Sequence, residues 1–455
     1  MNIPKTLTVN ATITSSGIEI QLNENKFPIV YPKKIWAKFP VNLKKILRDN
    51  LAYSSTLFVP QMLNLRDIEY KTNRPLSETF LYKNGIYDMP ISAIADGKKS
   101  IDYIRRFFNT RPTFQSDHIL APEFIDNREE KSKKIIIPFS FGKESLLTYS
   151  VAKDIGLDPV LVYVIEPSHT YEHFHKRKLI KLFEREFNIK IQTVFYNPGI
   201  FRYGKLWNLK TDLGWGLHTT DYSILLLPFL YYFGANLIAF GNEPSCNDYF
   251  YTQNLLTYKA AYDQHSDWIS QQSLLSTMLL GKKVQATSFV EPVYEIAETK
   301  ILQGRYPDIG KYQMSCEVKT LAGKINRWCQ NCTKCSYMYV LLTAFGTDPK
   351  KVGFTQNLLD KNHKDLYEYF FNYDADNPEY GSQEELGLAF YLTYLRNEKD
   401  YSVIKFEKKL LKKFMKSKKK LFQDFLSPQN SKTIPAYLKK KVLQIYSKEL
   451  QEFKT

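Results

Sequence analysis

The chain has 455 residues, of which 44% are apolar, 15% aromatic and 24% charged. This length exceeds what one hydrophobic core usually serves, and the composition excludes both a small peptide fold and a disordered chain. The longest apolar stretch, residues 224–240, is broken by Pro228, Gly234 and Asn236, so we expect no membrane span. The N-terminus alternates Thr and Asn with apolar residues and lacks a signal-peptide core, which predicts a cytoplasmic protein.

The net charge of +16 is concentrated near the C-terminus, where residues 401–455 contain 15 Lys and four acidic residues. Five apolar side chains recur there at helical intervals: Phe406, Leu410, Leu411, Phe414 and Met415. This pattern favours a packed helix with a solvated lysine face. Binding of nucleic acid through the Lys-rich tail is the less favoured interpretation, since a binding surface also requires a suitable geometry.

Residues 7–31 alternate apolar and polar side chains between short turn motifs, which predicts a small antiparallel sheet. Residues 43–108 have a more helical and mixed pattern, and the polar stretch 122–134 is typical of a linker. We therefore expect an α+β N-terminal domain over residues 1–130.

Runs rich in apolar residues follow the linker and alternate with segments of helical length. The runs are Ile135–Phe139, Val160–Ile165, Ile189–Tyr196 and Leu237–Phe240. Such runs are typical of strands buried on both faces, so the fold class is α/β with a doubly wound parallel sheet that binds ligands at the carboxyl ends of its strands. We expect this domain over residues 131–310, a four-Cys segment over 311–360, and a helical C-terminal region with the Lys-rich tail over 361–455.

A short polar turn, Ser140-Phe141-Gly142-Lys143-Glu144-Ser145, joins the first of these strands to a helix. Backbone N–H groups and the helix dipole favour an anion at such a position. Gly142 permits close approach of the backbone, the serines offer hydroxyls, and Lys143 offers a positive charge to a phosphate. The turn is not a Walker A loop, because Ile137 replaces the first glycine and Glu144 follows the lysine.

The turn resembles the SGGxDS signature of the PP-loop ATP pyrophosphatases. Ser140, Gly142 and Ser145 match it, whereas Phe141 replaces a glycine and Glu144 replaces an aspartate. The resemblance implies a HUP-type fold and cleavage of ATP between its α and β phosphates, with adenylation of a substrate. It also implies a magnesium-binding carboxylate at Glu144, one methylene longer than in the signature.

Four of the five cysteines form a C-x12-C-x2-C-x2-C pattern: Cys316, Cys329, Cys332 and Cys335. In a cytosolic enzyme, four thiols at this spacing favour a tetrahedral Zn²⁺ site over disulfides. Because sulfur fills all four positions, the zinc would be structural. The fifth, Cys246, is either a thiol on the substrate side or a small buried apolar residue.

Several acids and histidines follow the predicted strands. His169, His173 and His175 lie in a Lys/Arg-rich stretch, for which we expect a solvated helix start. More promising are three pairs in turns or helix starts: His218 with Asp221, Asn242 with Glu243, and Asp263 with His265. Each could act on a bound substrate, and each could equally be a capping residue.

Three further stretches resemble the ATP-dependent epimerases of UDP-N-acetylmuramoyl-L-alanyl-L-glutamate. They are GNEPSCNDYF with the downstream YDQHSDW, then EPVYEIAETKIL, and then SCEVK followed by RWCQNCTKCSYMYVLLTAF and NLLD. This resemblance spans roughly residues 135–360. It implies adenylation of the terminal L-glutamate carboxylate with release of pyrophosphate, followed by isomerisation at the α-carbon, in peptidoglycan precursor synthesis for the cell wall.

On this resemblance, ATP and Mg²⁺ are expected cofactors and a small-molecule carboxylate is the expected substrate. The structural Zn²⁺ expected from the cysteine spacing is the third cofactor. The phosphates and magnesium would be bound by Ser140, Gly142, Lys143, Glu144 and Ser145. Glu243, Asp263 and His265 are the candidates for proton transfer.

Two alternatives remain. A 7-cyano-7-deazaguanine synthase or a tRNA-modifying PP-loop enzyme would combine the same loop with a cysteine cluster, although the synthases usually lack a large N-terminal domain. In the other alternative, Phe141 and Glu144 have disabled the loop, and the chain is a catalytically inactive nucleotide-binding protein held together by zinc.

Overall fold

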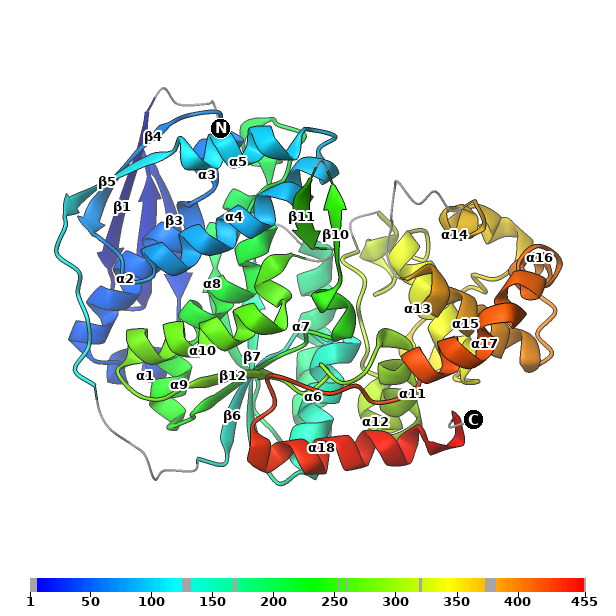
Figure 1. Cartoon of the computed structure of the whole chain (residues 1–455). Coiled ribbons are helices and arrows are strands. Elements are labelled where there is room, and N and C mark those ends of the chain that lie inside the picture. Colours follow the sequence, from blue (N-terminus) through cyan, green and yellow to red (C-terminus); the bar gives the residue numbers. More distant parts are fainter. Residues whose placement is uncertain are drawn as a thin grey trace. The chain divides into compact units, whose positions relative to one another are not determined.

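The structure is a computed structural model that describes residues 6–124, 132–166, 170–252, 254–258, 261–318, 321–372 and 382–453 (Figure 1). The chain divides into two compact units that interleave along the sequence. The first unit comprises Met1–Pro138, Gly156–Ser168 and Lys190–Ser288. The second comprises Phe139–Ile155, His169–Ile189 and Phe289–Thr455. The consecutive domain boundaries expected from the sequence stay a prediction.

The first unit is built on one ten-stranded sheet with the order β12-β9-β6-β7-β8-β3-β2-β1-β4-β5. Its strands are β1 (Leu7–Ile13), β2 (Gly17–Leu22), β3 (Asn25–Val30), β4 (Asp67–Asn73), β5 (Arg111–Ser116), β6 (Lys134–Pro138), β7 (Asp158–Ile165), β8 (Gln192–Tyr196), β9 (Leu237–Phe240) and β12 (Gln285–Ser288). Most neighbouring strands pair in parallel. The expected mixed α/β class with a parallel-dominated sheet is therefore confirmed.

The predicted antiparallel strands at the N-terminus are confirmed. β1 pairs with β2 and β2 pairs with β3, both antiparallel. The sheet does not end there, because β3 also pairs antiparallel with β8 through Ile29 opposite Tyr196 and Val30 opposite Phe195. Backbone hydrogen bonds thus join the N-terminal strands and the later parallel strands into one continuous sheet.

The four apolar runs form β6, β7, β8 and β9, which together with β12 make the parallel part of the sheet. Numbered in chain order, these five strands have the spatial order 3-2-1-4-5. The order reverses at β6, which lies between β7 and β9. In open α/β sheets of this kind, ligands bind beyond the carboxyl ends of the strands at the reversal point. The assignment to the HUP type stays a prediction.

Helices pack on this sheet and close the core of the first unit: α2 packs on β1, and α10 packs on β12. The helices are α1 (Lys33–Lys38), α2 (Val41–Thr56), α3 (Val59–Met62), α4 (Glu78–Ala95), α5 (Ser100–Phe108), α8 (His218–Leu225), α9 (Leu227–Phe233) and α10 (Ser266–Leu280). A separate hairpin is formed by β10 (Tyr249–Thr252) and β11 (Leu255–Tyr258). The mixed, helical pattern of residues 43–108 did not predict strand β4, which lies between α3 and α4.

The regular secondary structure in the described residues of the second unit consists of helices. Its helices are α6 (Lys143–Asp154), α7 (Thr170–Phe187), α11 (Glu295–Arg305), α12 (Pro307–Gly310), α13 (Thr333–Ala344), α14 (Glu368–Phe371), α15 (Gln383–Leu395), α16 (Tyr401–Lys409), α17 (Leu411–Phe425) and α18 (Ala436–Glu449). α11 packs on α6, and α13 packs on α15, which in turn packs on α17. The expected helical C-terminal region is confirmed.

The Lys-rich tail folds as a packed helix with a solvated face. In α17, Phe414, Leu421, Phe422 and Phe425 are buried, whereas most lysines between them are exposed. Met415 was predicted from its spacing to lie on the apolar face, but its side chain is 49% exposed. Among the residues that the structure describes, no helix combines the length and the apolarity needed to cross a bilayer.

Candidate functional site

The predicted phosphate loop leaves β6 after Pro138 and enters α6 at Lys143, with Gly142 as the N-cap. Within the loop, the Gly142 N–H donates to Ser140 Oγ at 3.3 Å, and Ser145 Oγ donates to the Gly142 carbonyl at 3.1 Å. A Cβ atom at position 142 would lie 2.7 Å from Glu144 Oε2, so a larger residue there would displace the Glu144 carboxylate. The first-turn N–H groups of such a helix have no intrahelical acceptors and suit an anion.

Phe141 takes the backbone conformation that the glycine of the SGGxDS signature favours. Its φ is +61°, in the left-handed region. Its ring is fully buried against Phe139 and Phe183, with ring centroids 4.7 and 5.8 Å apart. Its carbonyl accepts a hydrogen bond from the Met314 N–H at 2.8 Å. Phe141 therefore gives the turn a left-handed conformation and anchors it with a buried ring.

The side chain of Lys143 is buried among three glutamates. Its Nζ forms an ion pair with Glu144, lies 2.7 Å from Glu295 Oε2, and lies 3.7 Å from Glu298 Oε2. Burial lowers the pKa of Lys143, but the three carboxylates more than offset this and hold the pKa well above its ordinary value. Lys143 thus neutralises a carboxylate cluster, and its contact with a phosphate stays a prediction.

Glu144 is the most exposed of the three glutamates in this cluster. Its side chain is 31% exposed, whereas that of Glu295 is 24% exposed and that of Glu298 is 0% exposed. Burial raises the pKa of Glu144, but the neighbouring Lys143 ammonium lowers it below its ordinary value. The side chain is therefore ionised at neutral pH and presents an oxygen ligand of the type that Mg²⁺ prefers. Its role in binding magnesium stays a prediction.

Glu295 and Glu298 are not among the site residues predicted from the sequence. Both lie in the first turn of α11, three residues apart, which places them on one face of the helix. Both residues lie in the stretch EPVYEIAETKIL, which resembles the epimerases. That resemblance did not indicate that the stretch contacts Lys143. That contact joins residues about 150 positions apart in the chain.

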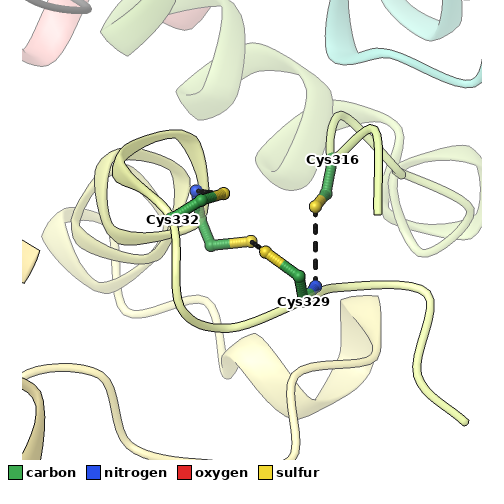
Figure 2. A group of neighbouring side chains, drawn as sticks. Cys316, Cys329 and Cys332 are labelled. Atoms are coloured by element: carbon green, nitrogen blue, oxygen red, sulfur yellow. Dashed lines mark hydrogen bonds between the residues drawn. The ribbon is translucent and has the colours of Figure 1, made fainter. Parts of the chain in front are cut away.

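The four cysteines of the C-x12-C-x2-C-x2-C pattern converge in the second unit (Figure 2). Their sulfur atoms all lie within 4.8 Å of one another. A tetrahedral site with Zn–S bonds of about 2.3 Å places its sulfurs about 3.8 Å apart. Three backbone N–H groups point at the sulfurs: those of Val318 and Cys329 at Cys316 Sγ, and that of Cys335 at Cys332 Sγ. The cluster could therefore bind a metal.

Trp328, directly before the second cysteine, is fully buried and fixes this segment. Its Nε1 donates to the Val352 carbonyl at 2.7 Å, and its ring stacks on Phe354. The fifth cysteine, Cys246, is buried in the first unit, with its Sγ 3.5 Å from Gln264 Oε1.

The three residues proposed for proton transfer lie in the first unit and have local partners. Glu243 caps a short 3-10 helix (Pro244–Asn247) and accepts from the Ser245 N–H at 2.9 Å. His265 caps α10, where its Nδ1 accepts from the Asp267 N–H at 3.1 Å. Asp263 is fully buried and accepts from the Thr219 N–H at 2.6 Å and its hydroxyl at 2.9 Å. Their role in catalysis stays a prediction.

Asp263 lies near a second buried acid, Asp88 of α4. Burial, and then the charge of Asp88, raise the pKa of Asp263 to about 7. Burial likewise raises the pKa of Asp88 to about 6, against the hydrogen bonds that it accepts from Ser92 and two backbone N–H groups. Two carboxyl groups whose pKa values are raised toward neutral pH therefore lie inside the first unit.

A second polar cluster, which we call the Arg202 cluster, contains Arg202, Glu166, Asp221, Tyr196 and Tyr222. Arg202 forms ion pairs with Glu166 and Asp221. Tyr196 donates to Asp221, and Tyr222 donates to Glu166, both at 3.1 Å. His218 borders the cluster, with its Nε2 3.8 Å from Glu166 Oε1. His218 and Asp221 were predicted from the sequence as candidate site residues, whereas Glu166 and Arg202 were not.

The expectation for the other histidines is wrong in part. His173 and His175 lie near the start of α7, as expected, but they are buried rather than solvated. The His175 Nε2 lies 2.7 Å from the Gly323 carbonyl, so the ring packs inside the second unit. His169 lies outside the described residues.

Comparison with known proteins adds one finding. No curated protein matches this chain. Residues 313–423, however, match the family model described as the MurL C-terminal domain. The matched segment contains all four clustered cysteines and extends into α17. The epimerase resemblance noted in the sequence is thereby supported, and the cysteine-bearing part of the second unit is similar to the C-terminal domain of the MurL epimerases.

Proposed function

We propose that this protein is an ATP-dependent epimerase that acts on the terminal L-glutamate of UDP-N-acetylmuramoyl-L-alanyl-L-glutamate. The observation that carries the proposal is the match of residues 313–423 to the MurL C-terminal domain. The stretches around residues 241–268 and 291–302, outside the matched segment, support it by their resemblance to the same epimerases.

The proposed first step is adenylation of the glutamate carboxylate with release of pyrophosphate. The phosphate loop supports this step, because it follows β6, the strand at which the parallel order reverses, and opens the N-terminus of α6. Ser140, Ser145 and the backbone at Gly142 would bind the phosphates. Glu144 would supply an oxygen ligand to Mg²⁺, which neutralises phosphate charge.

Adenylation makes the epimerisation chemically accessible. Removal of the α-proton beside a free carboxylate would add negative charge to a group that is already anionic. In the acyl-adenylate, the electron pair of the C–H bond can be delocalised onto the carbonyl oxygen as an enolate. A base then takes the proton, and an acid returns one to the opposite face. Glu243, Asp263 and His265 remain candidates for these roles.

We also propose that the four clustered cysteines bind a structural Zn²⁺. The fit rests on four sulfurs within 4.8 Å of one another and on the N–H groups that surround them. Such an ion would tie residue 316 to the 329–335 turn and stabilise the fold without an open coordination position.

The experiment measures pyrophosphate release from ATP and Mg²⁺, with UDP-N-acetylmuramoyl-L-alanyl-L-glutamate, preQ-type carboxylate precursors or bulk tRNA added separately. We expect release only with the muramoyl dipeptide, and D-glutamate after hydrolysis of the product. Pyrophosphate release with another addition would refute the proposed substrate. No pyrophosphate release with any of the additions would refute the proposal that the protein is an ATP-dependent enzyme.

Ser145→Ala is the test variant and Ser150→Ala its matched control. Both serines lie in α6 and donate to a backbone carbonyl, but only Ser145 lies in the loop. Loss of one hydrogen bond to a charged phosphate, worth about 1.5–3 kcal/mol, would slow pyrophosphate release roughly 10- to 150-fold in the test variant. The control should retain the wild-type rate.

A further inference from the structure

The Arg202 cluster is an ion network buried in the first unit. The side chains of Arg202, Glu166 and Asp221 are between 3% and 7% exposed. Removing charged groups from water costs several kcal/mol per ion, so such a network persists only when its charges compensate one another. Here one guanidinium faces two carboxylates, which leaves one negative charge uncompensated when both acids are ionised.

His218 can supply the missing positive charge reversibly. Its Nε2 lies 3.8 Å from Glu166 Oε1. Burial raises the pKa of Glu166, but Arg202 and then His218 lower it below its ordinary value, so Glu166 is the anion of the network. Burial raises the pKa of Asp221 to about 6 against the attraction of Arg202. Histidine is the side chain most often used as a general acid or base.

The imidazole is both held in place and accessible. His218 begins α8, and its ring packs edge-on against Trp215 and Tyr222, with centroids 5.7 and 4.5 Å away. The Tyr222 hydroxyl donates to the same Glu166 oxygen that faces His218, which fixes that oxygen. The His218 side chain is nevertheless 31% exposed. It thus connects the buried network to the outside of the first unit.

The network also lies where an α/β sheet binds its ligands. Glu166 is the first residue after β7, at the carboxyl end of a parallel strand. Ligands of open α/β sheets bind beyond these ends. His218 is partly exposed and is oriented by the buried Glu166 carboxylate, which Arg202 holds in place. This arrangement is suited to general acid–base catalysis.

We propose that His218 transfers the proton at the α-carbon of the activated glutamate and that Glu166 is its positioning residue. This inference rests on the proposed function. With Glu166 orienting the ring, neutral His218 takes the α-proton on a ring nitrogen. The electron pair of the broken C–H bond moves into the carbonyl of the acyl-adenylate, giving an enolate and an imidazolium. A second group donates a proton to the opposite face of the enolate. In the reverse direction that group removes the proton, and the His218 imidazolium returns one to its own face.

The test separates activation from proton transfer. The protein is incubated in D₂O with ATP, Mg²⁺ and UDP-N-acetylmuramoyl-L-alanyl-L-glutamate, and both pyrophosphate release and deuterium at the α-carbon are measured. For His218→Gln we expect pyrophosphate release within about threefold of wild type and deuterium incorporation slowed by roughly 10²- to 10⁴-fold. For His218→Gly, added imidazole should restore part of the exchange, which a purely structural histidine would not allow.

Two further variants examine the carboxylate. Glu166→Gln should slow exchange while pyrophosphate release continues, and Glu166→Asp should recover part of the exchange because it retains the charge. His363→Gln is the matched control, since His363 also pairs with a carboxylate, that of Asp360 at 2.8 Å, in the second unit. The His363→Gln variant should retain the wild-type rates of pyrophosphate release and of deuterium exchange at the α-carbon.

The outcomes distinguish the two proposals. Wild-type protein that releases no pyrophosphate with this substrate overturns the proposed function and this inference with it. Normal release in wild type together with full exchange in His218→Gln overturns the inference alone. So does a His218→Gln protein that melts like wild type but has lost pyrophosphate release as well, because its defect would then precede the proton transfer.

Discussion

The Met314 N–H donates a hydrogen bond to the Phe141 carbonyl, with 2.8 Å between nitrogen and oxygen. Met314 precedes the first clustered cysteine, Cys316, by two residues. The segment that leads into the cysteine cluster therefore also contacts the predicted phosphate loop. A metal in the cluster would stabilise the loop through this short stretch of backbone.

We expect Cys332→Ser, or removal of the metal by a chelator, to speed amide exchange at Met314 and in the loop, because Cys316 would lose its tether. Hydrogen–deuterium exchange and zinc content measured on the same samples provide the test. Cys246→Ser is the matched control and should change neither. Unchanged exchange in zinc-free protein would show that the cluster does not support the loop.

Lys143→Met should strongly destabilise the second unit. The substitution leaves three carboxylates without their cation, and breaking a buried ion pair costs about 3–5 kcal/mol. Urea unfolding measures the change. Lys311→Met is the comparison, because the Lys311–Glu186 pair is 41% and 37% exposed and such pairs contribute at most about 1 kcal/mol. Equal losses in the two variants would contradict the charge-compensating role of Lys143.

Phe141→Gly should be more stable than Phe141→Ala, the reverse of the usual order. Both variants lose the buried ring, at about 3–5 kcal/mol. Only alanine retains the strain of the left-handed backbone, about 1–2 kcal/mol. Urea unfolding of the two variants isolates this difference. An alanine variant that is the more stable of the two would refute a left-handed conformation at this position.

The raised pKa of Asp263 makes the stability of the first unit depend on pH. Its pKa is about 7 in the folded protein, against about 3.9 in an unfolded chain. Between these values the folded state binds the extra proton, so stability falls as pH rises from about 4 to about 7. Relative to Asp263→Asn, wild type should lose up to about 1.4 kcal/mol per pH unit in this window. Parallel urea-unfolding curves against pH for the two proteins would contradict the shift.

Local patterns were sufficient for the parallel strands and for the cysteine cluster. Residues 135–137 and 237–240 form uninterrupted apolar runs, and strands buried on both faces require such runs. The cysteines were found because metal ligation fixes both residue type and spacing. In each case the signal lies within a few adjacent residues.

Contacts between distant segments could not be predicted. Residues 67–73 do alternate between exposed and buried positions, but the segment is short and charged at Asp67, Glu69 and Lys71, so the surrounding helical pattern obscured it. Glu298 and Lys143 meet only because α11 packs on α6. Glu166 and Arg202 are likewise 36 residues apart, and no local pattern indicates that they form a pair.

The interleaving of the two units constrains how the protein can be synthesised and divided. The chain passes from one unit to the other five times, and the first unit is complete only at Ser288. Until that residue leaves the ribosome, β12 is absent and β9 has one unpaired edge, a surface prone to pairing with other chains. Neither unit corresponds to a continuous gene fragment. We therefore expect that no single truncation point yields either unit intact and by itself.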